Sequence, residues 1–165
     1  MCVVTIVILL KIAISIENDD LTLLLKPVDR VVSLITDSPS VYLTDIGYIH
    51  HDLHIVIDKS CSGFNFFIIC FTMLSMLIVR QVNKGRHKVM LLPAVVTCSY
   101  VLTIFANSSR ILISIFLTHA AEFSKTYSWL HQAEGVFVYL FFLISIYLIF
   151  EYACTTLLSQ HEKSA

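Results

Sequence analysis

Long apolar runs separated by shorter polar stretches dominate the hydrophobic pattern of this 165-residue chain. An α-helix needs roughly 18–20 apolar residues to cross a bilayer, and most of the runs approach that length. The pattern predicts about four transmembrane helices, at residues 1–16, 64–79, 89–106 and 136–152. The first run is slightly short and contains Lys11, but it lacks the basic start and the cleavage site of a signal peptide. We therefore expect it to form an uncleaved helix.

Two more polar segments, residues 17–60 and 107–130, separate these runs. In the first, which is acidic, apolar positions from 28 to 35 follow a period near 3.6 just after Pro27 and predict a short amphipathic helix. A turn at 37–39 and alternating apolar positions up to residue 57 predict a small β-hairpin. In the second, residues 111–117 form either an interfacial helix or a continuation of the third helix. The two segments predict a small cap over the helix ends.

Basic residues indicate which side of the membrane each segment occupies. A cluster from Arg80 to Lys88 follows the second helix, and the positive-inside rule assigns such a short loop to the cytoplasm. Segments 17–60 and 107–130 then lie on the outer side, where Tyr127 and Trp129 suit an aromatic belt. The sequence therefore predicts one all-α, multi-pass membrane domain over residues 1–165, with a small extracytoplasmic cap.

Composition agrees with a bilayer environment and narrows the functions. Hydrophobic residues make up 57% of the chain and the mean hydropathy is +0.82, which is far above soluble averages. The formal net charge of -1 points to no nucleic-acid partner. The five cysteines form no C-x-x-C pair and no zinc spacing, which argues against a redox dithiol and a structural zinc. We expect no cofactor and no metal.

Three reactive side chains fall at the outer ends of the second, third and fourth predicted helices. Cys61 comes just before the second helix, beside Lys59, where helix N–H groups and a cation favour a thiolate. Arg110 needs a partner or a function in an apolar region, and His131 precedes Gly135, where a small residue permits close helix contact. A nucleophile, an oxyanion-stabilising cation and a general acid or base together predict an acyl-transfer site.

The same residues lie in three segments, 57–63, 106–111 and 131–135, that resemble the signature blocks of the exosortase and archaeosortase membrane transpeptidases. The short chain most resembles the exosortase K branch. The resemblance implies a cysteine peptidase in the bacterial cytoplasmic membrane that cuts the C-terminal sorting helix of exported proteins on the outer side. It assigns Cys61 as the nucleophile, with Arg110 and His131 completing the catalytic set. Supporting roles are expected for residues beside the nucleophile and the arginine, namely Ser62, Gly63 and Asn107.

Other readings of these residues stay open at this point. Arg110 can simply anchor a helix at the headgroups, and Asn107 can be a cap or can orient Arg110. A different class of function is a non-enzymatic membrane scaffold or metal sensor, because His50, Asp52 and His54 would share one face of a β-strand. A thiol oxidoreductase is disfavoured, since Cys61 has no second thiol with it on the outer side.

Overall fold

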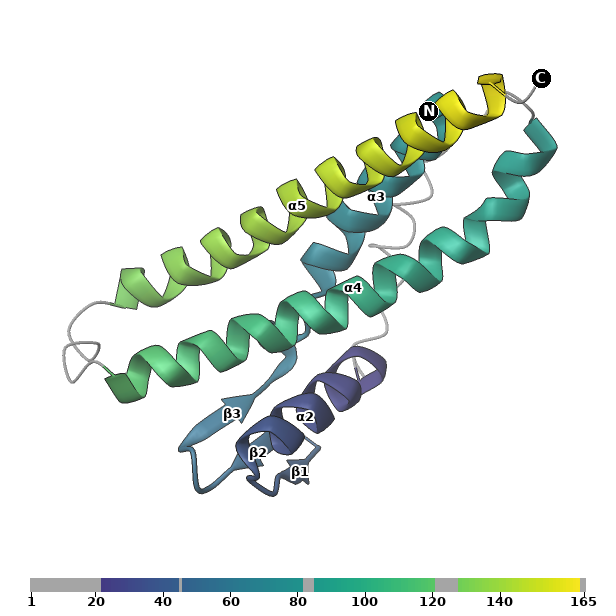
Figure 1. Cartoon of the computed structure of the whole chain (residues 1–165). Coiled ribbons are helices and arrows are strands. Elements are labelled where there is room, and N and C mark those ends of the chain that lie inside the picture. The colour runs from purple at the N-terminus through teal and green to yellow at the C-terminus, as the bar shows by residue number, and fades with distance from the viewer. Residues whose placement is uncertain (1–21, 45, 82–84, 121–127, 164–165) are drawn as a thin grey trace.

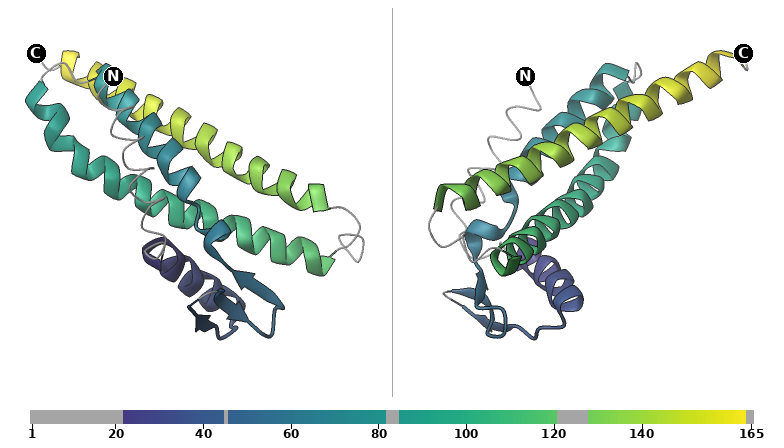
Figure 2. Two further views of the ribbon diagram at one scale, coloured as in Figure 1. Left: turned by 180° about the vertical axis from the view of Figure 1, so that it is seen from behind. Right: turned by 60° about the vertical axis from the view of Figure 1, so that its left-hand side comes forward.

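The computed structural model describes residues 22–44, 46–81, 85–120 and 128–163. Long helices form most of this part of the chain, and a small cap lies against the middle one (Figure 1). The long helices are α3 (Phe64–Gln81), α4 (Gly85–Ala120) and α5 (Ser128–Lys163). The cap consists of α2 (Thr22–Thr36) and a sheet of three short strands. Helix α4 contacts α2, α3 and α5, so it joins the cap to the bundle (Figure 2).

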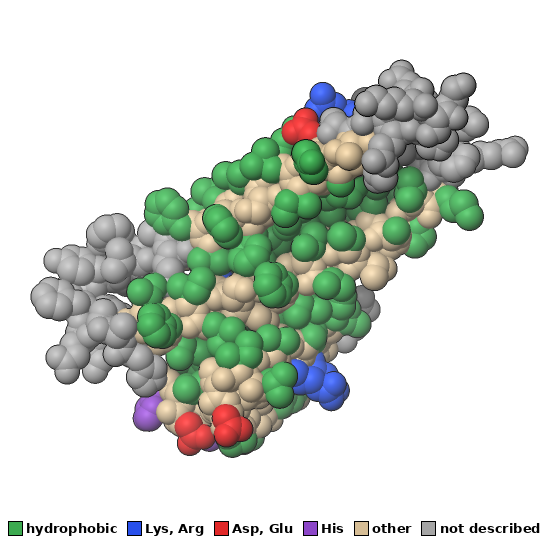
Figure 3. All heavy atoms as spheres, in the orientation of Figure 1, with side chains coloured by type: hydrophobic (Ala, Val, Ile, Leu, Met, Phe, Trp, Pro, Cys, Tyr) green, Lys and Arg blue, Asp and Glu red, His purple; other side chains and the backbone are tan. Residues whose placement is uncertain are grey.

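The helices have the length and composition of membrane spans. Within the described residues, three stretches are long and apolar enough to cross a bilayer, at Lys59–Arg80, Met90–Leu117 and Gly135–Ala153. Large apolar side chains of α5, such as Phe137 and Phe141, are exposed, and apolar side chains cover most of the visible face (Figure 3). The prediction of a multi-pass helical membrane protein with a small cap is confirmed. The helix predicted at 1–16 lies outside the described residues.

The helices extend beyond the predicted ends. Helix α4 does not stop at residue 106 but continues to Ala120, so the first part of the predicted outer segment 107–130 is a continuation of the third helix. The stretch 94–120 contains neither glycine nor proline, and nothing in it breaks the backbone hydrogen bonding of a helix. Helix α5 likewise begins at Ser128 rather than at 136. Both helices are therefore longer than predicted, and the two ends of each lie far apart.

The cap contains one strand more than a hairpin. Strands β1 (Val41–Leu43), β2 (Gly47–His50) and β3 (Ile55–Ile57) form an antiparallel sheet in the order β1-β2-β3. Buried side chains of α2, namely Leu25, Val28 and Val32, pack with Ile57 of β3 and Ile111 of α4. Two residues of the predicted apolar face of α2, Leu34 and Ile35, are instead exposed. The face that α2 buries runs from Leu24 to Val32 and so begins earlier than predicted.

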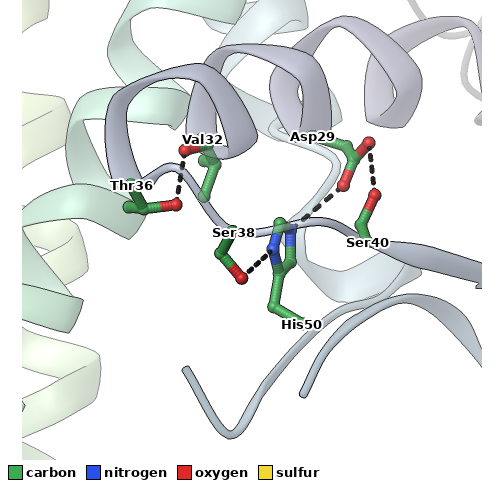
Figure 4. A network of polar contacts seen from close by, with 6 residues as sticks. All are labelled: Asp29, Val32, Thr36, Ser38, Ser40 and His50. Atoms are coloured by element: carbon green, nitrogen blue, oxygen red, sulfur yellow. Dashed lines mark hydrogen bonds and ion pairs between the residues drawn. The ribbon is translucent and has the colours of Figure 1, made fainter. Parts of the chain in front are cut away.

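A buried polar network ties the sheet to α2 (Figure 4). His50 is fully buried, with Nε2 3.1 Å from Asp29 Oδ1 and Nδ1 3.3 Å from Ser38 Oγ. The hydroxyl of Ser40 donates to the other oxygen of Asp29 at 3.0 Å. The prediction that His50 shares a strand face with Asp52 and His54 is wrong, because β2 ends at His50 and a turn follows. The buried imidazole pairs with α2 instead of facing those residues.

Candidate functional site

A single turn of 3-10 helix, η1 (Lys59–Cys61), carries the cysteine between β3 and α3. Asp58 caps this turn: its Oδ1 accepts hydrogen bonds from the backbone N–H groups of Ser60 (3.0 Å) and Cys61 (3.2 Å) and from Ser60 Oγ (2.6 Å). A side-chain acceptor at this position satisfies N–H groups that a short helix leaves free. The hydrogen bonds to Asp58 fix the backbone of Cys61, whose side chain is half-buried.

This arrangement changes the electrostatic setting that the sequence predicts for the thiol. The N–H groups of Ser60 and Cys61 donate to the carboxylate of Asp58, and Gly63 separates the turn from the first residue of α3. Partial burial raises the pKa of Asp58, but the hydrogen bonds from Ser60 and Cys61 outweigh it and lower that pKa below its usual value. An anionic carboxylate thus lies beside Cys61, and sequence reasoning did not assign it a role.

Asn107 connects α4 to the cysteine. Its side chain is fully buried, and its Nδ2 donates a hydrogen bond to the backbone carbonyl of Cys61. Gly63 makes this approach possible: its φ is +70°, and a Cβ there would lie 3.0 Å from Cγ of Asn107. A side chain at residue 63 would therefore be strained and would push against the amide. Two of the predicted supporting residues thus contact each other beside the cysteine.

Arg110 lies one helical turn after Asn107 and faces α5. Its guanidinium carbon is 5.3 Å from the ring centroid of Tyr139, a cation–π distance. A Cβ on Gly135 would lie 3.3 Å from Cδ of Arg110, so the missing side chain of this glycine leaves room for the arginine. The hydroxyl of Tyr139 donates to Oδ1 of Asn107 at 2.6 Å. Tyr139 therefore contacts both Asn107 and Arg110 of α4.

The structure brings together most of the predicted set. Cys61, Gly63, Asn107 and Arg110 lie in one connected group that Tyr139 completes. Ser62 is buried, and its Oγ accepts from the N–H of Phe64 at 3.4 Å, so it caps the start of α3.

His131 lies in α5, four residues before Gly135, and its side chain is outside the described part of the structure. Sequence reasoning missed Asp58 and Tyr139. The sequence does contain one indication of Tyr139: its hydroxyl-bearing side chain lies four residues after Gly135, on the same helical face.

Metal binding has little support in this part of the chain. Among the described residues, no three His, Cys, Asp or Glu side chains lie close enough together to hold a metal ion. The histidine that sequence reasoning placed in a possible metal site, His50, is instead paired with Asp29.

The fold and the site define a class: a multi-pass helical membrane protein with a half-buried cysteine at the junction of its cap and its helices. A sequence profile of the transmembrane exosortase family matches residues 40–150. The chain therefore belongs to the transmembrane exosortase family. The matched range includes the cap sheet, Cys61, Asn107 and Arg110 of α4 and the first part of α5.

Searches among curated proteins and among solved structures found no match. Membership in the exosortase family supports a role as a membrane peptidase or transpeptidase in general terms.

Proposed function

We propose that this chain is a membrane cysteine peptidase or transpeptidase that cleaves a C-terminal sorting signal from exported proteins, with Cys61 as the nucleophile. The observation that carries the proposal is the hydrogen bond from Asn107 to the carbonyl of Cys61. It brings the segment before α3 against the helix that presents Arg110 one turn later. Segments 46 residues apart thus meet at the cysteine, and in this proposal the Cys61 thiol and the Arg110 guanidinium act on one substrate carbonyl.

The chemistry proceeds in two steps. The Cys61 thiolate attacks the scissile carbonyl carbon, and Arg110 stabilises the oxyanion of the tetrahedral intermediate. The C–N bond then breaks, His131 gives a proton to the leaving amine, and a thioester on Cys61 remains. In the second step water or an acceptor amine attacks the thioester, gives a proton back to His131 and releases the thiolate as the C–S bond breaks. Water yields a carboxylic acid and an amine yields a new amide, so the product distinguishes hydrolysis from transfer.

The distribution of charge supports an outer-side location in a bacterial cytoplasmic membrane. The basic cluster begins at Arg80, in the last turn of α3, whereas Cys61 precedes the start of that helix. A basic loop stays in the cytoplasm. A span between the two then exposes the cysteine on the opposite face, where exported proteins arrive. The surrounding lipid bilayer and the substrate's own apolar helix are the partners that this placement implies.

The test measures the C-terminus of an exported protein that ends in an apolar helix and a basic tail. This protein is co-expressed with wild type, with Cys61→Ala and with Cys98→Ala, and its intact mass is determined. Removing a nucleophile costs at least about 1,000-fold in rate, so Cys61→Ala should leave the tail in place. Cys98 is an exposed cysteine on α4 outside the site, and Cys98→Ala should cleave as wild type does.

The mass of the shortened product identifies its new end. A mass that corresponds to a free carboxylate indicates hydrolysis, and a larger one indicates an acceptor. Cleavage that persists at the wild-type rate in Cys61→Ala would contradict the nucleophile assignment. Uncut protein in every strain, with exported proteins encoded beside this chain as substrates, would favour a non-enzymatic scaffold.

A further inference from the structure

The hydrogen bonds around Asn107 have a fixed direction. The backbone carbonyl of Cys61 can only accept, so the amide nitrogen of Asn107 must face it. The amide oxygen then faces Tyr139, and the phenol must donate its proton to that oxygen, at 2.6 Å. The Cys61 carbonyl therefore sets the direction of both hydrogen bonds, and the Tyr139 hydroxyl holds the amide from the other side.

Tyr139 also contacts the catalytic cation. Arg110 lies over its ring, with 5.3 Å between the guanidinium carbon and the ring centroid. The ring packs against Phe66 of α3 at a centroid distance of 5.0 Å. The Tyr139 side chain of α5 is thus fixed by α3. It touches Asn107, which holds the nucleophile, and Arg110, which is the oxyanion-stabilising group.

We infer that Tyr139 is a positioning residue of the peptidase site, an inference that rests on the proposed function. Its hydroxyl orients the Asn107 amide, which holds the Cys61 turn, and its ring holds Arg110. Its proton is already donated to Asn107, so it does not protonate the leaving amine, a step that remains with His131. Tyr139 therefore acts through Asn107 and Arg110 and needs no contact with the substrate.

The two contacts of Tyr139 can be separated by substitution. Tyr139→Phe removes the hydroxyl but keeps the ring under Arg110 and against Phe66. The buried oxygen of Asn107 then loses its donor, and the amide can turn that oxygen toward the carbonyl of Cys61, where two acceptors repel. Tyr139→Leu removes the ring contact as well. Processing rates should fall in the order wild type, Tyr139→Phe, Tyr139→Leu.

The first measurement is the processing rate of purified, reconstituted variants on the exported protein that wild type cleaves. Tyr139→Phe should lower kcat roughly tenfold, because one buried acceptor is left unpaired, with KM changed less than twofold. In an Asn107→Leu background the same substitution should change kcat less than twofold, since the amide through which it acts is gone. Tyr147→Phe is the matched control: Tyr147 lies two turns further along α5 and packs against the apolar core of the bundle. It should process like wild type.

The second measurement needs no substrate. Hydrogen–deuterium exchange of the peptide that contains Cys61 should become at least threefold faster in Tyr139→Phe, whereas exchange in α2 stays as in wild type. Unchanged exchange near Cys61, or a wild-type kcat in Tyr139→Phe, overturns the inference even if wild type is an active peptidase. If wild type cleaves nothing while exchange near Cys61 still depends on the Tyr139 hydroxyl, the proposed function fails and the positioning contact stands.

Discussion

The close approach between Gly63 and Asn107 makes a sharp prediction about Gly63→Ala. Residue 63 has a φ of +70°, and a Cβ built on it would lie 3.0 Å from Cγ and 3.1 Å from Cβ of Asn107. Carbon atoms prefer about 3.5–4.0 Å, so the turn and α4 would have to separate by a few tenths of an ångström. The neighbouring atoms belong to a fully buried side chain on a helix, which cannot swing aside.

Two effects set the size of the loss. Placing a non-glycine residue in the left-handed region costs roughly 1–2 kcal/mol. Weakening the hydrogen bond from Asn107 to the Cys61 carbonyl costs about 0.5–1.5 kcal/mol more. Each 1.36 kcal/mol corresponds to about a tenfold change in rate. If the strain is released by moving the Cys61 turn, processing should fall by about 10- to 400-fold.

Gly135→Ala is the matched control for stability. Gly135 lies inside helix α5, and the three atoms nearest to a Cβ there all belong to Arg110: Cδ at 3.3 Å, Nη1 at 3.6 Å and Cγ at 4.0 Å. That flexible side chain can shift, and alanine stabilises a helix interior by roughly 0.5–1 kcal/mol over glycine. Gly135→Ala should therefore keep or raise the midpoint of thermal unfolding in detergent.

The assay compares the two variants with wild type, by intact mass of the substrate over time and by thermal unfolding followed with size-exclusion chromatography. Gly63→Ala should lose processing while the bundle still elutes as a folded protein. If Gly63→Ala cleaves within twofold of wild type and unfolds at the same temperature, the turn does not approach Asn107 as described, and the positioning role of the amide has to be abandoned.

Two further predictions concern the cap and its link to the site. His50→Ala leaves the buried carboxylate of Asp29 without its imidazole partner and should destabilise the cap by about 2–3 kcal/mol, seen as faster hydrogen exchange in β2; unchanged protection there would contradict the buried pair. The pKa of Asp58 is lowered in the folded protein, so its stabilising effect is present above its unfolded pKa of about 3.9 and is lost as the pH falls through the lower folded value. Asp58→Asn should therefore lower the unfolding midpoint at pH 6 and approach wild type near pH 3; an equal difference at both pH values would show that ionisation is not involved.

Hydropathy was sufficient to predict the helices but not their ends. The apolar runs of α3, α4 and α5 are long enough that any arrangement in a bilayer must make them helical. The end predicted at residue 106 rested on the polar group from Asn107 to Arg110. In the structure these polar side chains face neighbouring elements rather than water, so the helix passes through them unchanged. Hydropathy averages over such a group and cannot distinguish an internal polar face from a helix end.

The cap was predictable where local sequence decides it. Gly47 has a φ of +116° and begins β2, where a glycine adopts this conformation without strain directly after the turn from β1. The second turn, after His50, was missed because a histidine in a run of polar residues carries no turn signal of its own. The burial of His50 depends on Asp29, which lies 21 residues earlier, on α2. A contact of that range is decided by packing and not by local propensity.

The site shows the same division more clearly, and it indicates what sort of residue remains hidden. Cys61 and Arg110 are conspicuous in a sequence because a thiol and a charge are rare and costly at such places, and each has a chemistry of its own. Tyr139 lies among aromatic residues that face lipid and has no distinctive neighbours along the chain. Its importance arises only from partners on α4, the nearer of which is 29 residues away. Residues that react can be predicted from their type and their position in the sequence. Residues that orient them are identified by the direction of their hydrogen bonds, and that direction is known only once the fold is known.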